Sequence, residues 1–139
     1  MRKLVVVLTA CVSLLAAVPA WAHHAFAAEF DADKPIKFKG TVTKMEWINP
    51  HAWIHIDVIG EDGKVTPWMI EAAAPNALLR RGWTKKDLLA GTEIVIEGFQ
   101  AKDGANRANG SVITFTDGKK LFVGSSAGDP GAAPGAPSK

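Results

Sequence analysis

Histidine is the residue type in this sequence best suited to chemistry, and its four copies fall into two pairs. His23 and His24 are adjacent, whereas His51 and His55 are separated by four positions. Imidazole is the commonest metal ligand among side chains, and nitrogen-rich sites favour copper over most other divalent ions. These four histidines are therefore the candidate metal ligands.

The first pair is best able to bind a metal ion if the chain is cleaved just before His23. A positive start, an apolar run over residues 4–18 and the small residues Ala20 and Ala22 predict a secretory signal peptide over residues 1–22. Cleavage after Ala22 would give His23 a free α-amino group, so that amine and imidazole could chelate one Cu(II) ion. Cleavage after Ala20 would place His23 third, a square-planar Cu(II) or Ni(II) arrangement. The alternative is a frayed end that binds nothing.

Export also fixes the charge and the redox chemistry of the mature chain. The apolar run is shorter than the ~20 residues that span a bilayer, and the run before Cys11 is too short for a lipoprotein signal. Either cut removes Cys11, the one cysteine, and with it all thiol chemistry. Removing residues 1–22 leaves 14 basic against 14 acidic residues. We therefore expect a periplasmic or secreted protein with no membrane span and no nucleic-acid partner, since phosphate binding needs excess positive charge.

Strand geometry limits what the second pair can bind. On one straight strand His51 and His55 would lie about 13 Å apart, so they share an ion only if His51 curls back in the turn after Pro50. His55 and Asp57 would be about 6.6 Å apart, close enough to share one. Trp53 lies on the same face and could stack on a ligand. The face is thus either a metal site, a non-metal interaction surface at Trp53 and Asp57 for a glycan or protein partner, or a solvated strand face.

The elements that position these residues follow from apolar alternation and turn signals. Strands are predicted over residues 36–47, 52–59, 64–72, 93–101, 112–116 and 121–123. A helix is predicted between the third and fourth, because Pro75 begins and Gly82 follows a helical stretch, and Thr84 to Asp87 resembles a capping box. This order predicts an all-β fold with one short helix, a small OB-like barrel. Another open β-sheet crossed by a helix is the alternative. Trp83 is expected to cover the barrel end.

The chain has room for one domain, because 139 residues with 47% hydrophobic content support a single core. We expect a signal peptide at 1–22, an N-terminal arm at 23–33, the barrel at 34–123 and a disordered Gly/Ala/Pro/Ser tail at 124–139. The sequence carries no serine-hydrolase elbow, phosphate loop or dinucleotide fingerprint. It therefore predicts a binding protein and not an enzyme, with copper as the candidate cofactor.

Several short motifs resemble a family of small exported bacterial proteins of unassigned function. They are His23 to Phe26, Glu29 to Asp31, Gly40 to Val42, Asn49 to His51, Asn76 to Trp83 and Lys102 to Gly104. The resemblance runs from His23 to about Ser126 and implies a periplasmic or secreted protein with a small β-barrel. His23 alone also resembles the first residue of the histidine-brace copper proteins, including the lytic polysaccharide monooxygenases. Their larger β-sandwich and oxidative activity are not implied for this chain.

Overall fold

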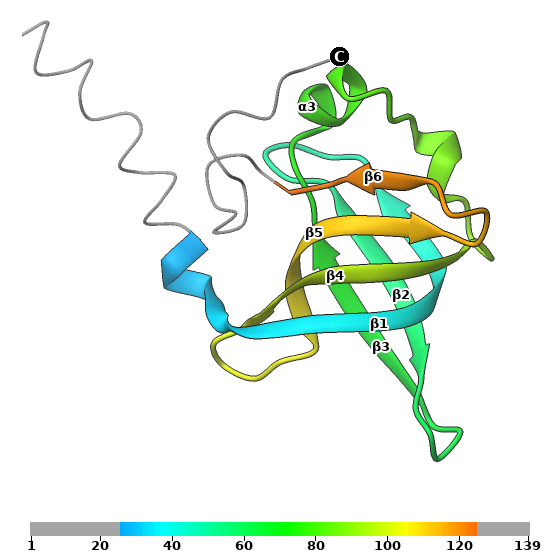
Figure 1. The fold of residues 1–139 in the computed structure, drawn as a ribbon. Coiled ribbons are helices and arrows are strands. Elements are labelled where there is room, and N and C mark those ends of the chain that lie inside the picture. The colour runs from blue at the N-terminus through cyan, green and yellow to red at the C-terminus, as the bar shows by residue number, and fades with distance from the viewer. Residues whose placement is uncertain (1–25, 125–139) are drawn as a thin grey trace, which may run out of the picture.

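The computed structural model describes residues 26–124 (Figure 1). The elements within that range are β1 (Phe30–Glu46), β2 (Trp53–Ile59), β3 (Val65–Glu71), α3 (Pro75–Arg80), the 3-10 helix η1 (Lys85–Leu88), β4 (Glu93–Ala101), β5 (Arg107–Phe115) and β6 (Lys120–Phe122). Residues 26–29 form a further helical turn before β1. No helix in this range is long and apolar enough to cross a membrane. The expected signal peptide, His23, His24 and tail residues 125–139 lie outside the described residues.

The strands form one sheet that closes on itself. Their order is β3-β2-β1-β4-β5-β6, and each of these neighbouring pairs is antiparallel. A parallel pairing between Met69–Glu71 of β3 and Arg107–Asn109 of β5 closes the ring, and we call this contact the β3–β5 seam. Helix α3 connects β3 to β4 and lies at one end of the barrel (Figure 1). This is the OB-type topology, so the predicted fold is confirmed.

Alternation along the strands decides which side chains enter the core. On β2, Ile54 and Ile56 are at most 1% exposed, whereas Trp53, His55 and Asp57 between and beside them are half-buried. Because successive side chains on a strand point to opposite faces, the three half-buried residues lie on the outside of the barrel. The predicted core face of β2 is confirmed, and with it the outward placement of the candidate site residues.

The end of the barrel is closed by the segment between β3 and β4. Helix α3 begins at Pro75, as predicted, and Gly82 follows it with a positive φ of 84°. Trp83 is 1% exposed and packs against Phe115, with ring centroids 6.5 Å apart. The predicted capping box is present: the Thr84 side chain accepts from the backbone of Lys86, and Asp87 accepts from the backbone of Thr84. It starts the short helix η1.

The first strand begins six residues earlier than its apolar alternation predicts, at Phe30 and not at Ile36. Its early part is polar, so no alternation marks it in the sequence. It is extended by pairing with β4 instead: Phe30 lies opposite Ala101, and a register break follows before Pro35 resumes the ladder. The long first strand therefore carries residues 26–29 to the far end of β4.

The fifth strand begins at Arg107, five residues before the predicted start at Val112. Its early residues are small or polar, which favours a loop by composition. They pair because the backbone of β5 lies close to β4 on one side and to β3, at the β3–β5 seam, on the other. A Cβ on Gly98 would lie 2.1 Å from the carbonyl oxygen of Asn109, and one on Gly110 would lie 2.8 Å from Cγ2 of Ile70. The small residues are what allow the barrel to close.

Candidate functional site

Two rows of side chains cross the outer face of the barrel over β1, β2, β3 and β5. Strand register fixes both rows, since residues opposite one another on paired strands point to the same side. The first row is Glu46, Trp53, Glu71 and Asn109, and the second is Lys44, His55, Met69 and Arg107. We call this surface the outer face. It brings Trp53 and His55, which the sequence predicts as site residues, together with carboxylates that the sequence pattern did not single out.

His51 joins the outer face from the segment just before β2. Its Nδ1 lies 3.3 Å from the carbonyl oxygen of Ala72 and 3.8 Å from Oε1 of Glu71. An imidazole with its proton on Nδ1 donates to that carbonyl and keeps the lone pair of Nε2 free. The His51 side chain is 38% exposed, so the ring is held from one side and open to solvent on the other.

Glu71 is the most deeply buried acid of the outer face, with 9% of its surface exposed. Asn109, itself 3% exposed, donates from Nδ2 to Oε1 of Glu71 at 3.1 Å. Burial raises the pKa of Glu71, and the charge of Glu29 raises it further. His51, the Asn109 amide and Arg107 act in the opposite direction. The carboxylate therefore lies where a nearby positive charge would be stabilising.

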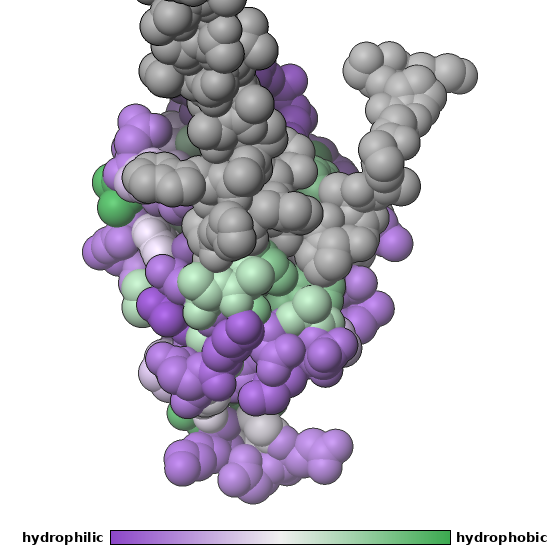
Figure 2. Space-filling view, turned by 90° about the vertical axis from the view of Figure 1, so that its left-hand side faces the viewer, coloured by the Kyte–Doolittle hydropathy of each residue, from purple (hydrophilic) through white to green (hydrophobic). Residues whose placement is uncertain are grey.

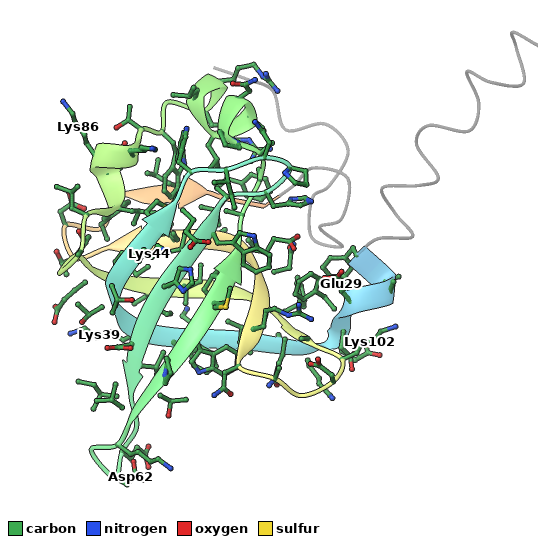
Figure 3. All side chains as sticks on the ribbon, turned by 180° about the vertical axis from the view of Figure 1, so that it is seen from behind. Glu29, Lys39, Lys44, Asp62, Lys86 and Lys102 are labelled. Carbon is green, nitrogen blue, oxygen red and sulfur yellow. The ribbon has the colours of Figure 1, made fainter. Side chains whose placement is uncertain are left out.

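The helical turn of residues 26–29 docks beside this cluster. The rings of Phe26 and Phe99 form a T-shaped pair with centroids 5.9 Å apart, and the backbone N–H of Lys102 donates to the carbonyl of Glu29 at 2.9 Å. The Lys102 ammonium also donates to the carbonyl of Ala27. Figure 3 shows Glu29 and Lys102 together at this turn, and Figure 2 looks onto this side of the molecule, where hydrophilic residues border an apolar surface. The turn thus docks on β4 at Phe99, the cross-strand neighbour of Asn109, whose amide bonds to Glu71.

His55 contacts a different carboxylate from His51. Its Nε2 lies 3.6 Å from Oε2 of Glu46, and the Lys44 ammonium bonds to the other oxygen, Oε1. Hydrogen bonding by Lys44 is the main reason that the pKa of Glu46 is lowered. His51 and His55 are therefore not brought together: each contacts its own glutamate, and the two glutamates are the cross-strand neighbours of Trp53 on either side.

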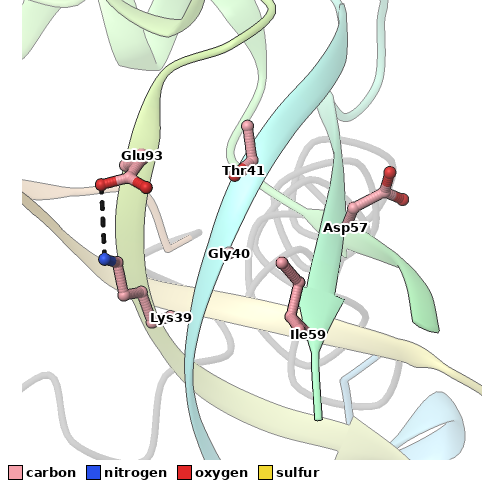
Figure 4. Close-up of a pocket in the computed structure, with 6 residues that line it drawn as sticks. All are labelled: Lys39, Gly40, Thr41, Asp57, Ile59 and Glu93. Atoms are coloured by element: carbon pink, nitrogen blue, oxygen red, sulfur yellow. Dashed lines mark ion pairs between the residues drawn. The ribbon is translucent and has the colours of Figure 1, made fainter. Parts of the chain in front are cut away.

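Asp57 lines a separate surface pocket further along β2. The pocket, of about 260 Å³, is formed by Lys39, Gly40, Thr41, Asp57, Ile59 and Glu93 (Figure 4). Lys39 and Glu93 form an ion pair of 3.3 Å across its edge. Within residues 26–124, no three His, Cys, Asp or Glu side chains are grouped so as to hold a metal ion.

Glu46, Glu71, Met69 and Asn109 belong to the site but were missed by sequence reasoning. Glu71 could have been found from the sequence. On the predicted strand 64–72 it lies two positions after Met69, so both side chains point away from the face that carries Ile70. Asn109 has no such signal, since its stretch reads as a loop.

Comparison with known proteins assigns a family and no activity. The sequence profile of a family of unknown function, DUF6152, matches residues 10–110 of the chain. No curated protein and no solved structure matches it. Because the profile covers most of the barrel as well as the segment before it, the chain belongs to the DUF6152 family.

Proposed function

We propose that the protein is exported and binds one Cu(II) ion, with His23 as the first ligand and His51 as the ligand that the barrel supplies. Cleavage after Ala22 gives His23 an amine and an imidazole, two nitrogen ligands on one residue. His51 adds a third nitrogen through Nε2. Nitrogen-rich sets of this kind favour copper over most other divalent ions. The protein then acts as a periplasmic or secreted copper-binding protein.

The observation that carries this proposal is the orientation of the His51 ring. Metal-binding histidines almost always direct their second nitrogen to a carbonyl or a carboxylate, which fixes the ring and its tautomer. Nδ1 of His51 lies 3.3 Å from the Ala72 carbonyl oxygen, which can accept its proton, and the Glu71 carboxylate at 3.8 Å adds a negative charge beside it without a hydrogen bond. Asn109 in turn holds Glu71 by a buried hydrogen bond. A solvated surface histidine needs none of these supports.

The covalent chain permits His23 to reach this ring. Glu29 is close enough to Glu71 for its charge to act on the Glu71 pKa. His23 precedes Phe26, where the helical turn begins, by three residues, and three residues span at most about 11 Å. The contacts of Phe26 and Lys102 anchor the intervening turn to the barrel. The buried Glu71 carboxylate beside the ring and the exposed Glu29 carboxylate would partly neutralise a divalent cation.

Copper titration of two matched proteins tests this proposal. One begins at His23, and the other carries three extra residues without histidine before it, which keeps every histidine, moves the amine off His23 and leaves neither His23 nor His24 in the third position. We expect the first to bind one Cu(II) at least about tenfold more tightly, because the extra residues break the chelate ring. His51→Ala in the first protein should lose a comparable factor. Equal affinity of all three proteins would refute the proposal.

A second candidate function rests on Trp53. This ring is half-buried on the outer face between Glu46 and Glu71, and aromatic rings beside hydrogen-bonding side chains are suited to stacking on sugars or docking a protein partner. Metal-free protein that binds an oligosaccharide, with loss of binding in Trp53→Ala, would favour this function. Copper binding that is indifferent to Trp53→Ala would favour the first.

A further inference from the structure

A second cluster on the outer face has an unsatisfied nitrogen at its centre. Nε2 of His55 is inaccessible to solvent and has no hydrogen-bond partner within residues 26–124. The nearest acidic atom, Oε2 of Glu46, is 3.6 Å away, which is too far for a hydrogen bond. Lys44 occupies the other oxygen of Glu46, so Oε2 remains free to face the ring. A buried polar atom without a partner is costly and calls for an explanation.

The gap between these two atoms has the size of a metal site. An ion about 2.1 Å from each of them would subtend an angle of about 120°, which is within the range of trigonal and tetrahedral coordination. A direct His–Glu hydrogen bond would bring the two atoms closer than this, to about 2.7–2.9 Å. The separation therefore suits an ion between the side chains better than a proton between them.

A methionine on the neighbouring strand can bring a thioether to this gap. Met69 on β3 is directly opposite His55 on β2, so both side chains leave the same face of the sheet. Directly opposite residues have Cβ atoms about 4.5–5.5 Å apart, a distance that the flexible methionine side chain can close. Met69 is 38% exposed, in a row of the outer face that also carries the charged Lys44 and Arg107. Thioether sulfur is a soft ligand that selects Cu(I).

We propose that His55, Met69 and Glu46 form a second metal site, selective for Cu(I). The imidazole Nε2 and the thioether sulfur are its ligands, and Oε2 of Glu46 supplies the negative charge. This site shares no residue with the Cu(II) site at His23 and His51, so it can exist whether or not that one does. It also explains why Nε2 of His55 and Oε2 of Glu46 face each other without a hydrogen bond.

Methionine methyl signals give a direct test. The chain beginning at residue 23 contains two methionines, Met45 and Met69. Met45 faces inward and packs against the core, so it serves as the internal control. In a His23→Ala, His24→Ala, His51→Ala background, His55 is the one remaining histidine. Addition of Cu(I), or of the redox-stable probe Ag(I), should shift the Met69 methyl signal and leave that of Met45 in place.

Affinity measurements complete the test. Against a chromogenic Cu(I) chelator under reducing conditions, Met69→Leu should weaken Cu(I) binding at least about tenfold, whereas Met45→Leu should not change it. Glu46→Gln should weaken it as well. Leucine is close to methionine in volume, so Met69→Leu is not expected to unfold the barrel. Unchanged Met69 signals, or equal Cu(I) affinity in Met69→Leu, would overturn the second site. Neither result bears on Cu(II) binding at the native terminus, which is measured in a different protein.

Discussion

Replacing Asn109 by alanine should destabilise the barrel through one buried charged hydrogen bond. Asn109 is 3% exposed and donates to the Glu71 carboxylate at 3.1 Å. Glu71 is 9% exposed, so water cannot readily take the place of the lost amide. Asn109→Ala therefore leaves a buried carboxylate with one fewer donor and removes packed atoms at the β3–β5 seam.

The expected loss is about 2–3 kcal/mol in the free energy of unfolding. Hydrogen bonds to charged groups contribute about 1.5–3 kcal/mol, and the truncated side chain adds a packing term. In a domain of about 100 residues, each kcal/mol corresponds to about 4–8 °C in Tm, so the expected drop is about 10–20 °C. This is a large share of the net stability of an ordinary domain.

Urea unfolding of four proteins in chelator-containing buffer isolates the hydrogen bond from the packing term. They are the parent, Asn109→Ala, Glu71→Gln and the double variant. Glutamine keeps the size of Glu71 but removes its charge, so the cost of Asn109→Ala should fall by about 1 kcal/mol in the Glu71→Gln background. An identical cost in both backgrounds would show that the carboxylate charge does not strengthen this hydrogen bond and would refute the reasoning.

Three further predictions concern other parts of the molecule. Asp87→Ala should lower the free energy of unfolding by about 1 kcal/mol at pH 7, because the Asp87 carboxylate accepts from the backbone N–H of Thr84 at the start of η1. Burial alone would raise the pKa of Asp87, but hydrogen bonds from Thr84 and the charge of Lys119 together lower it. The contribution of Asp87 to the free energy of unfolding is therefore lost as pH falls through that lowered pKa. Thermal melting of the parent and of Asp87→Ala from pH 7 to pH 2 checks this. Gly98→Ala should destabilise by about 1–3 kcal/mol or more, since its Cβ would lie 2.1 Å from the Asn109 carbonyl oxygen; unchanged urea unfolding would contradict that contact. Phe26→Ala should weaken Cu(II) binding about tenfold in a competition titration, because it releases the turn that presents His23; equal affinity would show that docking is irrelevant.

Most of the fold could be predicted because apolar alternation and turn residues record it directly. β4 was predicted at its observed bounds, and β2, β3 and α3 within one or two residues. The starts of β1 and β5 could not be predicted in this way. Both are stretches in which pairing is imposed by distant strands, and small or polar residues such as Gly110 are required by close approach and not by burial of a side chain.

The site was predictable only in part, for a similar reason. The outward placement of Trp53 and His55 follows from the period of two along β2, and the structure confirms it. Their partners follow from register, which single-strand patterns do not contain. Glu71 meets Asn109 across a parallel pairing of strands 38 positions apart in the chain. That contact exists only once the barrel has closed.

Paramagnetic broadening of amide NMR signals tests most directly whether a copper ion lies between the N-terminus and the barrel. One equivalent of Cu(II) is added to the labelled chain that begins at His23. Signals of residues beside the His51 ring, such as Glu71 and Ala72, should disappear. The signal of Asp62, at the tip of the β2–β3 hairpin and far from the N-terminal turn, should persist (Figure 3). Broadening confined to the residues that follow His24, with Glu71 and Ala72 unaffected, would contradict the account.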